Sequence, residues 1–340
     1  MKKLDLEAGL SIVVPFYNEG QNTSKSVGFV LDALKELDTP WEVIVVNDGS
    51  TDGISKEDFP TNIKYLKHEH SGRFKTRYLG LIESNYSNIL FIDARVWLDK
   101  ESLSNLRILI SENPNSRYWN GYITVNHTEK AQVSIWETLV LVGWGKGVGK
   151  SETLHFGLED FDRYPKGTTL FFAPKEDLVE AFQKVDSLKL KTTLISDDTK
   201  LLRFLAAKGD IWIDSKFSAE YQPRTTLLKF LRNGFYRGQT FVDSYWYSPT
   251  IFGKLVRLSL PLGVGLASAA VIIEGIKGGM LLALSIVLLS CASFFLYSFK
   301  SWKSYSRACK ESALIIPLLL IFGAGFVKAY VLGFRSRLSS

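Results

Sequence analysis

The sequence predicts an α/β head built around a mostly parallel sheet, followed by an α-helical transmembrane region. Two observations predict this arrangement. In the first part of the chain, short apolar runs alternate with stretches of helical periodicity, the pattern of strand–helix–strand units in parallel sheets. Near the C-terminus, three long stretches contain a single charged residue, Lys328, among them: 258–273, 278–299 and 312–334.

Four apolar runs are predicted to form strands of the sheet. They are "LSIVVP" at 10–15, "EVIVVN" at 42–47, "NIKYL" at 62–66 and "NILFID" at 88–93. Between the first two, apolar side chains recur at helical spacing over residues 21–37, which predicts a crossover helix. Ligands of such sheets bind at the carboxyl ends of the strands, where the loops emerge.

The predicted strand ends carry acids and turn-forming residues. "PFYNEG" follows the first strand, "NDGSTDG" the second and "DARV" the fourth. Asp48 and Gly49 are typical of a turn, and Ser50 or Thr51 can cap the next segment, so each motif alone is explained as a turn. Three acid-bearing strand ends in one unit favour a ligand site at this edge instead.

The uncharged stretches predict two to three transmembrane helices within residues 251–340. A bilayer core requires about 20 apolar residues per helix. Basic residues before the first stretch and between the second and third predict that these sides are cytoplasmic. No apolar signal stretch precedes the first strand, so the head is expected to be cytoplasmic and the chain a multi-pass protein of the cell membrane. Arg335 and Arg337 would lie outside if the third stretch crosses, so this stretch either crosses or lies in the interface.

Three regions are expected: a head at 1–222, an amphipathic segment at 223–250 and the membrane region at 251–340. The middle segment interleaves leucines and aromatic residues with Lys229 and Arg232. This pattern is typical of a helix that lies in the membrane interface, or of one that packs on the head.

Other classes of protein fit the sequence less well. The net charge of +6 arises largely beside the apolar stretches, so membrane lipids rather than nucleic acid are the expected partners. Residues 142–152, "VGWGKGVGKSE", approach a P-loop but place Trp144 where the first glycine must stand. Cys291 and Cys309 lack the spacing of a disulfide framework or a metal site.

Residues 10 to 210 resemble a family 2 glycosyltransferase of the GT-A fold. The matching motifs are "SIVVPFYNE", "VIVVNDGSTDG", "GRFKTRYLGL", "FIDARV" and "ISDDTKLLRFLAAKG". The resemblance implies a Rossmann-like catalytic domain that binds a nucleotide-sugar donor of the UDP or GDP type.

The resemblance also implies roles for individual residues. The loop from Pro15 through Tyr17 to Glu19, together with Asp48, would hold the base and ribose of the donor. Arg77 matches the family's arginine near the nucleotide. Asp93 would lie beside the diphosphate and its divalent metal, Mn²⁺ or Mg²⁺.

Two acids of the "SDD" motif are the expected catalytic residues. Asp198 matches the family's base, which takes the proton of the acceptor hydroxyl. Asp197 stands where the family has glutamate and would support it. The motif also opens a predicted helix, so the alternative is a capping pair stabilised by the helix dipole.

Arg95 stands where the family's acidic motif has its second acid. If the chain is extended there, residues 93 and 95 point to the same face. The Arg95 guanidinium would then neutralise part of the diphosphate charge that a metal otherwise neutralises. Metal binding is therefore expected to be weak or dispensable. Asp99, the other nearby acid, is expected to cap the following helix.

Four further residues are weaker candidates for the acceptor side. Asp160 and Asp162 lie in an acidic segment that, in the family, shapes the donor and acceptor pockets; the alternative is a solvated loop. Gln222 and Arg224 loosely resemble residues that membrane-bound relatives place on interface helices.

The expected function is transfer of a sugar, with inversion, to a hydroxyl of a lipid-linked saccharide or glycolipid in the assembly of a surface polysaccharide or glycan. Two alternatives stay open. One is a polyprenyl-phosphate sugar synthase, whose anionic acceptor hardly needs a base. The other is an inactive assembly subunit that keeps the fold without the chemistry.

Overall fold

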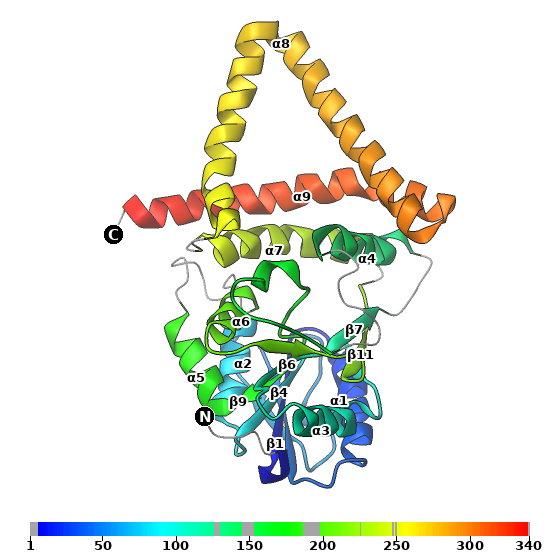
Figure 1. Cartoon of the computed structure of the whole chain (residues 1–340), viewed down its shortest axis with the longest axis vertical. Coiled ribbons are helices and arrows are strands. Elements are labelled where there is room, and N and C mark those ends of the chain that lie inside the picture. Colours follow the sequence, from blue (N-terminus) through cyan, green and yellow to red (C-terminus); the bar gives the residue numbers. More distant parts are fainter. Residues whose placement is uncertain are drawn as a thin grey trace. The chain divides into compact units, whose positions relative to one another are not determined.

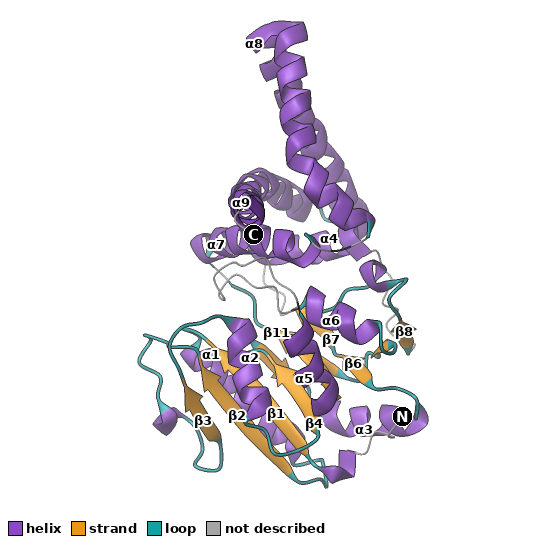
Figure 2. Ribbon diagram, turned by 90° about the vertical axis from the view of Figure 1, so that its left-hand side faces the viewer, coloured by secondary structure: helices purple, strands orange, loops and turns teal. Residues whose placement is uncertain are grey.

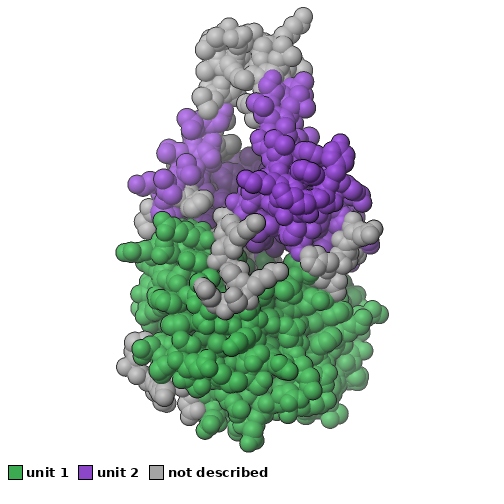
Figure 3. All heavy atoms as spheres, turned by 45° about the vertical axis from the view of Figure 1, so that its right-hand side comes forward, with its two compact units in different colours: residues 1–126, 143–186, 191–223 green, residues 127–142, 187–190, 224–340 purple. Residues whose placement is uncertain are grey.

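The computed structural model describes residues 6–125, 130–144, 153–185, 198–224, 226–246, 248 and 250–338; for 143–144, 252, 260, 264–283, 286 and 333–338 it describes the backbone only. The chain divides into two compact units, shown in Figure 3. The head unit comprises residues 1–126, 143–186 and 191–223, and the helical unit comprises 127–142, 187–190 and 224–340.

An eight-stranded sheet forms the centre of the head unit, in the order β3-β2-β1-β4-β9-β6-β10-β8. The strands are β1 (Leu10–Phe16), β2 (Trp41–Asn47), β3 (Lys64–Lys67), β4 (Asn88–Ile92), β6 (Tyr118–Asn120), β8 (Leu154–Phe156), β9 (Leu170–Pro174) and β10 (Ile211–Ile213). The first four are mutually parallel, as is the β6–β10 pair, whereas β9 and β8 run antiparallel to their neighbours. The prediction of a mostly parallel α/β sheet is therefore confirmed.

Helices cover both faces of this sheet, which explains the continuous apolar runs in its strands. Successive side chains of a strand point to opposite faces. Ile12 packs in one core, with α1 (Gly20–Leu34) and α3 (Ser102–Glu112). Val13 packs in the other, with the helices α2 (Arg73–Ile82), α5 (Lys175–Lys184) and α6 (Thr199–Ala206) (Figure 2).

A second, three-stranded sheet has the order β5-β11-β7. Its strands are β5 (Val96–Leu98), β7 (Tyr122–Val125) and β11 (Ser218–Tyr221), and three short 3₁₀ helices complete the described head: Leu6–Ala8, Lys56–Asp58 and Phe161–Arg163. Since β4 ends at Ile92 and β5 begins at Val96, the "DAR" segment connects the two sheets directly.

The helical unit contains α4 (Ala131–Trp144), α7 (Leu227–Tyr245), α8 (Ile251–Trp302) and α9 (Tyr305–Leu338). Figures 1 and 2 show α8 doubling back on itself, while α9 runs alongside α7. Among the described residues one helix, Tyr305–Leu332, is long and apolar enough to cross a membrane, and an 18-residue window within it has a mean hydropathy of 2.2. The first two predicted spans fall in α8, where side chains 264–283 lie outside the description.

Candidate functional site

The predicted site residues gather at one edge of the head sheet. Because β3, β2, β1 and β4 are adjacent and parallel, their carboxyl ends meet at the same edge (Figure 2). The loops that follow these strands carry Tyr17 and Glu19, Asp48, the segment 68–72, and Asp93. The third loop contains two histidines that were not among the predicted site residues.

The first two loops are hydrogen-bonded to each other. The Asn18 backbone N–H donates to Ser50 Oγ at 2.9 Å, and the Asn18 side-chain oxygen accepts from the Thr51 N–H at 2.8 Å. Asp52 accepts from the Gly20 N–H at 2.8 Å, at the start of α1. Asn18 itself has φ of 52°, a left-handed conformation that asparagine tolerates. The two predicted nucleotide loops therefore form one rigid element.

Asp48 is buried at the centre of this edge. Its carboxylate accepts from the backbone N–H groups of Ser71, at 2.7 Å, and Gly72, at 3.0 Å, just before α2. His70 Nδ1 lies 2.9 Å from the same carboxylate, and the His70 ring stacks on Tyr17 with 4.0 Å between centroids. Tyr17 and His70 are both about 40% exposed, so an aromatic surface is accessible to solvent beside the hydrogen-bonded carboxylate of Asp48.

The first turns of α2 connect the other two predicted acids. Arg77 is fully buried and forms an ion pair with Asp93. Asp198 accepts from the hydroxyl and the backbone N–H of Thr168. Burial opposes ionisation of Asp198, but the charges of Arg73 and Arg77 and the Thr168 hydroxyl outweigh it and hold the pKa of Asp198 below its usual value. Asp198 is therefore ionised at neutral pH.

Arg95 binds protein groups in this structure. Its guanidinium lies 2.6 Å from a carboxylate oxygen of Glu19 and donates to the carbonyl oxygens of Gln222, at 3.2 Å, and Pro223, at 3.4 Å. Arg95 thus joins the first loop to the end of the head chain. Its predicted contact with the diphosphate stays a prediction, and binding a diphosphate there would require Glu19 to share the guanidinium.

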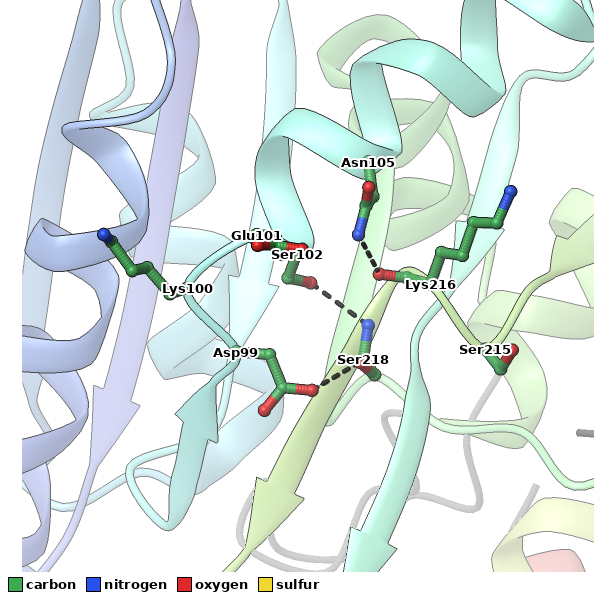
Figure 4. A pocket seen from close by; sticks show the side chains of 8 residues that line it. All are labelled: Asp99, Lys100, Glu101, Ser102, Asn105, Ser215, Lys216 and Ser218. Carbon is green, nitrogen blue, oxygen red and sulfur yellow. Dashed lines mark hydrogen bonds between the residues drawn. The ribbon is translucent and has the colours of Figure 1, made fainter.

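The expectation that Asp99 caps α3 is wrong. The residue before α3 is Glu101, which makes no side-chain capping bond, and the Asp99 carboxylate accepts from the Ser218 hydroxyl. A surface pocket of about 350 Å³ lies here. Figure 4 shows that, in its wall, the Asn105 side chain donates to the Lys216 carbonyl and the Ser218 N–H donates to the Ser102 hydroxyl. None of the predicted site residues lines this pocket.

The weaker candidates for the acceptor side make different contacts. Asp160 is exposed and pairs with Arg163 at 2.6 Å, whereas Asp162 pairs at 2.8 Å with Arg203 of α6, the helix that Asp198 precedes. The Gln222 side chain donates to Glu220 at 2.6 Å. Arg224, the fourth weaker candidate, belongs to the helical unit. Asp197, one of the two expected catalytic acids, lies outside the described residues.

Lys166 lies close to Asp162 and was not predicted from the sequence. Its ammonium group stands 4.2 Å from the centroid of the Phe161 ring and donates to the Tyr164 carbonyl at 2.9 Å. Burial lowers the pKa of Lys166 to about 8, against the opposing charge of Asp162. Two residues further on, Thr168 holds Asp198, so Lys166 belongs to the same part of the head.

The described side chains do not make a metal site by themselves. No group of three or more histidine, cysteine or acidic side chains that could hold a metal occurs among them. Asp93 offers one carboxylate, which Arg77 already engages. Mg²⁺ and Mn²⁺ prefer several oxygen ligands, so these residues do not fit a metal held by the protein alone.

Comparisons with known proteins find similarity to glycosyltransferases in part of the chain. The model of glycosyl transferase family 2 matches residues 11–159. An uncharacterized glycosyltransferase of Rickettsia bellii is 34% identical over 99 residues, which are 27% of this chain and 14% of that protein. Glycosyltransferase GlyA of Streptococcus pneumoniae serotype 4 is 27% identical over 126 residues, which are 35% of this chain and 18% of that protein. The chain thus matches less than a fifth of the length of either relative.

A solved structure shares the fold. The mannosyltransferase PcManGT from Pyrobaculum calidifontis, in complex with GDP-Man and Mn²⁺, superposes with a TM-score of 0.52 and 14% identity, over 90% of this chain and 86% of that one. At this identity the likeness shows the architecture alone. Residues 11–159 therefore match the glycosyl transferase family 2 model, and the head has the GT-A α/β fold.

Proposed function

We propose that the chain is a membrane-attached inverting glycosyltransferase, which moves a sugar from a nucleotide-sugar to a hydroxyl group of a lipid-linked saccharide or glycolipid. One observation carries the proposal. The first turns of α2, with the two residues before them, connect three predicted acids: residues 71 and 72 bind Asp48, Arg77 pairs with Asp93, and the charges of Arg73 and Arg77 lower the pKa of Asp198.

The donor would lie along this edge with its base beside Tyr17 and His70. An exposed aromatic surface next to a buried carboxylate suits a nucleobase, which offers a flat face for stacking and N–H groups for hydrogen bonding. The diphosphate would then approach the start of α2, where the charges of Arg73 and of the buried Arg77, with backbone N–H groups, favour an anion.

Transfer would use Asp198 as the base. The acceptor hydroxyl gives its proton to the Asp198 carboxylate as its oxygen bonds to the anomeric carbon. The bond from that carbon to the diphosphate oxygen breaks on the opposite face, so the configuration inverts. A depressed pKa keeps Asp198 ionised and ready to accept, while Arg73 and Arg77 balance the negative charge that leaves with the nucleotide.

A bound metal would supply further neutralisation of the diphosphate. The PcManGT complex contains Mn²⁺. In this chain Asp93, the carboxylate predicted to lie beside the diphosphate, is already paired with Arg77. We therefore assign the charge balance to the arginines and expect metal dependence to be weak.

The helical unit supports membrane attachment. Large apolar side chains stand exposed along its described helices, among them Leu258, Leu289 and Leu320, each more than 60% exposed. Soluble proteins rarely expose contiguous apolar surface on this scale. A transferase attached to a membrane meets acceptors that are themselves held in lipid, which favours a lipid-linked acceptor.

The proposal is tested with purified membranes that contain the full chain. They are incubated with a panel of UDP- and GDP-sugars and lipid-linked acceptors, and product is followed by release of nucleotide and by the anomeric configuration of the new bond. Inverted product on a hydroxyl acceptor supports the proposal. Transfer to polyprenyl phosphate alone would favour the synthase alternative, and neither transfer nor nucleotide binding would favour the inactive subunit.

A further inference from the structure

Among the described residues, the helix that is long and apolar enough to cross a membrane packs along a helix that is not. In the described residues α9 is the candidate span, yet it lies beside α7 over most of the length of α7. Within its 19 residues α7 carries Lys229, Arg232, Arg237 and Asp243. Each such charge at the centre of a bilayer costs about 2.5–3.5 kcal/mol on the insertion scale, so α7 cannot span.

Glycines bring the two helix backbones into direct contact. A Cβ added at Gly238 of α7 would lie 2.1 Å from the Phe322 carbonyl oxygen of α9, and one added at Gly325 of α9 would lie 2.1 Å from the Phe235 carbonyl oxygen of α7. Gly234 faces Leu318 one turn away from Gly238. Small residues at this spacing allow close helix packing. The orientation of α9 is therefore fixed by that of α7.

Aromatic contacts extend this packing towards the C-terminus. Trp246 meets Tyr330 edge-on at 5.0 Å, and Phe241 meets Phe322 at 5.8 Å. The ammonium group of Lys328 lies 5.5 Å from the centroid of the Phe235 ring. The paired surface thus runs along both helices from Gly234 to Trp246 of α7.

The opposite face of α9 is apolar and exposed. Ile316, Leu320, Val327 and Val331 recur on it at helical spacing, while Leu318 and Ala329 are buried on the other face. Helix α9 therefore has one face packed against a charged helix and one exposed apolar face, which is the pattern of a helix lying in a membrane interface.

The two ends of α9 carry the same charge. Arg307 and Lys310 lie near its start, and Arg335 and Arg337 near its end. Basic residues are retained on the cytoplasmic side of a membrane, so a helix with basic residues at both ends fits best with both ends on one side. The positive ends also suit anionic lipid headgroups.

We infer that α9 does not cross the membrane but lies flat at the headgroup–acyl boundary of one leaflet, with both ends on the same side as α7. Its exposed apolar face enters the acyl region, and its basic ends meet the headgroups. This inference rests on the membrane attachment in the proposed function and is independent of sugar transfer.

Cysteine accessibility in sealed vesicles tests the inference on the full chain. Starting from Cys291→Ala, one variant keeps the exposed Cys309 near the start of α9. Two others replace Cys309 by alanine and add Ser336→Cys, at the basic end of the helix, or Lys229→Cys, in α7. Each is treated with a membrane-impermeant maleimide before and after detergent, which gives the fraction of each cysteine on the outer side of the vesicle.

The inference predicts the same outer fraction for all three positions. A cysteine at 336 labelled from the side opposite to those at 229 and 309 would show that α9 crosses, and would overturn the inference while leaving membrane attachment intact. Recovery of the chain in the soluble fraction without detergent would overturn both the inference and the membrane part of the proposed function.

Two glycines of α9 provide a matched pair of variants. Gly325→Ala places a methyl group against the backbone of α7, whereas Gly323→Ala places one in open space. Both raise helix propensity equally, so they differ in packing alone. In Gly325→Ala the two helices are expected to separate, which would allow α9 to cross the membrane. Part of the cysteine at position 336 would then be labelled from the opposite side. Gly323→Ala is expected to keep the labelling pattern of the parent. Identical labelling of the two variants would contradict the role assigned to α7.

Discussion

Asp198 in the head unit and Glu311 in the helical unit are both acids held beside arginines, but their surroundings differ. Glu311 is completely buried. It accepts from the hydroxyls of Thr138 and Ser298, both at 2.7 Å, and from Arg307 Nε at 2.7 Å. The same arginine reaches Glu137 of α4 at 2.8 Å and stacks on Trp302 at 3.7 Å. Both carboxylate oxygens of Glu311 are therefore engaged by protein donors.

Asp198 stands in a less closed environment. It is half-buried, the donors to its carboxylate among the described residues come from Thr168, and the arginines act on it through charge. It also belongs to the edge where Tyr17 and His70 are exposed. A buried acid saturated by protein donors thus fastens helices together, whereas an ionised acid near exposed strand ends can serve a ligand.

The largest expected effect comes from removing the proposed base. Asp198→Asn keeps the shape of the side chain and its bond to Thr168 but cannot accept the acceptor's proton. Transfer is expected to fall about 10²- to 10⁴-fold with nucleotide binding retained. Steady-state rates and nucleotide titrations measure the two quantities, and Asp160→Asn, an exposed acid paired with Arg163, is the control. A rate close to that of the parent would exclude Asp198 as the base and favour a phosphate acceptor.

A second variant removes the buried carboxylate of Glu311. Glu311→Ala leaves Arg307, Thr138 and Ser298 without their acceptor in a buried site, so a loss of about 3–5 kcal/mol in unfolding free energy is expected. Thermal unfolding of the detergent-solubilised chain measures it, with the exposed Glu112→Ala as control. Equal melting temperatures for the two variants would show that the network does not hold the helical unit together.

A smaller effect is expected at the aromatic surface, where the chain offers a matched pair. His70 pairs with Asp48 and stacks on Tyr17; His155 of β8 pairs with Asp210 at 2.7 Å and stacks on Trp212 at 4.6 Å. His70→Ala is expected to weaken nucleotide binding by about 0.5–1.5 kcal/mol, up to roughly tenfold. Calorimetry should show no change for His155→Ala. Equal losses in both variants would mean that the strand-end position carries no special role.

The smallest effect is expected from Lys166. Its pKa is lowered to about 8, so the side chain is charged below that pH and neutral above it. Loss of this positive charge near Asp198 is expected to reduce transfer a few-fold as the pH rises through 8. Lys166→Arg stays charged over this range, so its pH–rate profile should lack the inflection. The same inflection in parent and variant would assign it to another group.

The strands and strand ends of the head could be predicted because they depend on local patterns. Continuous apolar runs specify buried parallel strands, and the residues after them must lie at one edge. The same rule applies to the end of β3, where His68 and His70 follow "YLK", and it places His70 at this edge too. Helix boundaries follow less closely from local patterns: the helix predicted at 21–37 is α1, Gly20–Leu34.

The partners of Arg95 and Glu311 could not be predicted, because they are distant in sequence. Arg95 contacts the Gln222 carbonyl 127 residues away, and Thr138 meets Glu311 across 173 residues. No periodicity or motif encodes such a pairing. The placement of α4 in the helical unit has the same origin, since its hydrophobic pattern says only that it is buried and not against which helix.

Nucleotide-induced stabilisation tests most directly whether the strand-end edge of the head binds a nucleotide. The melting temperature of the full chain is measured with UDP and with GDP, for the parent and for Asp48→Ala. A nucleotide at 100 times its dissociation constant should add about 2.7 kcal/mol to the unfolding free energy of the parent, and the shift should be lost in Asp48→Ala. An equal shift in both proteins, or none with any nucleotide, would contradict the account.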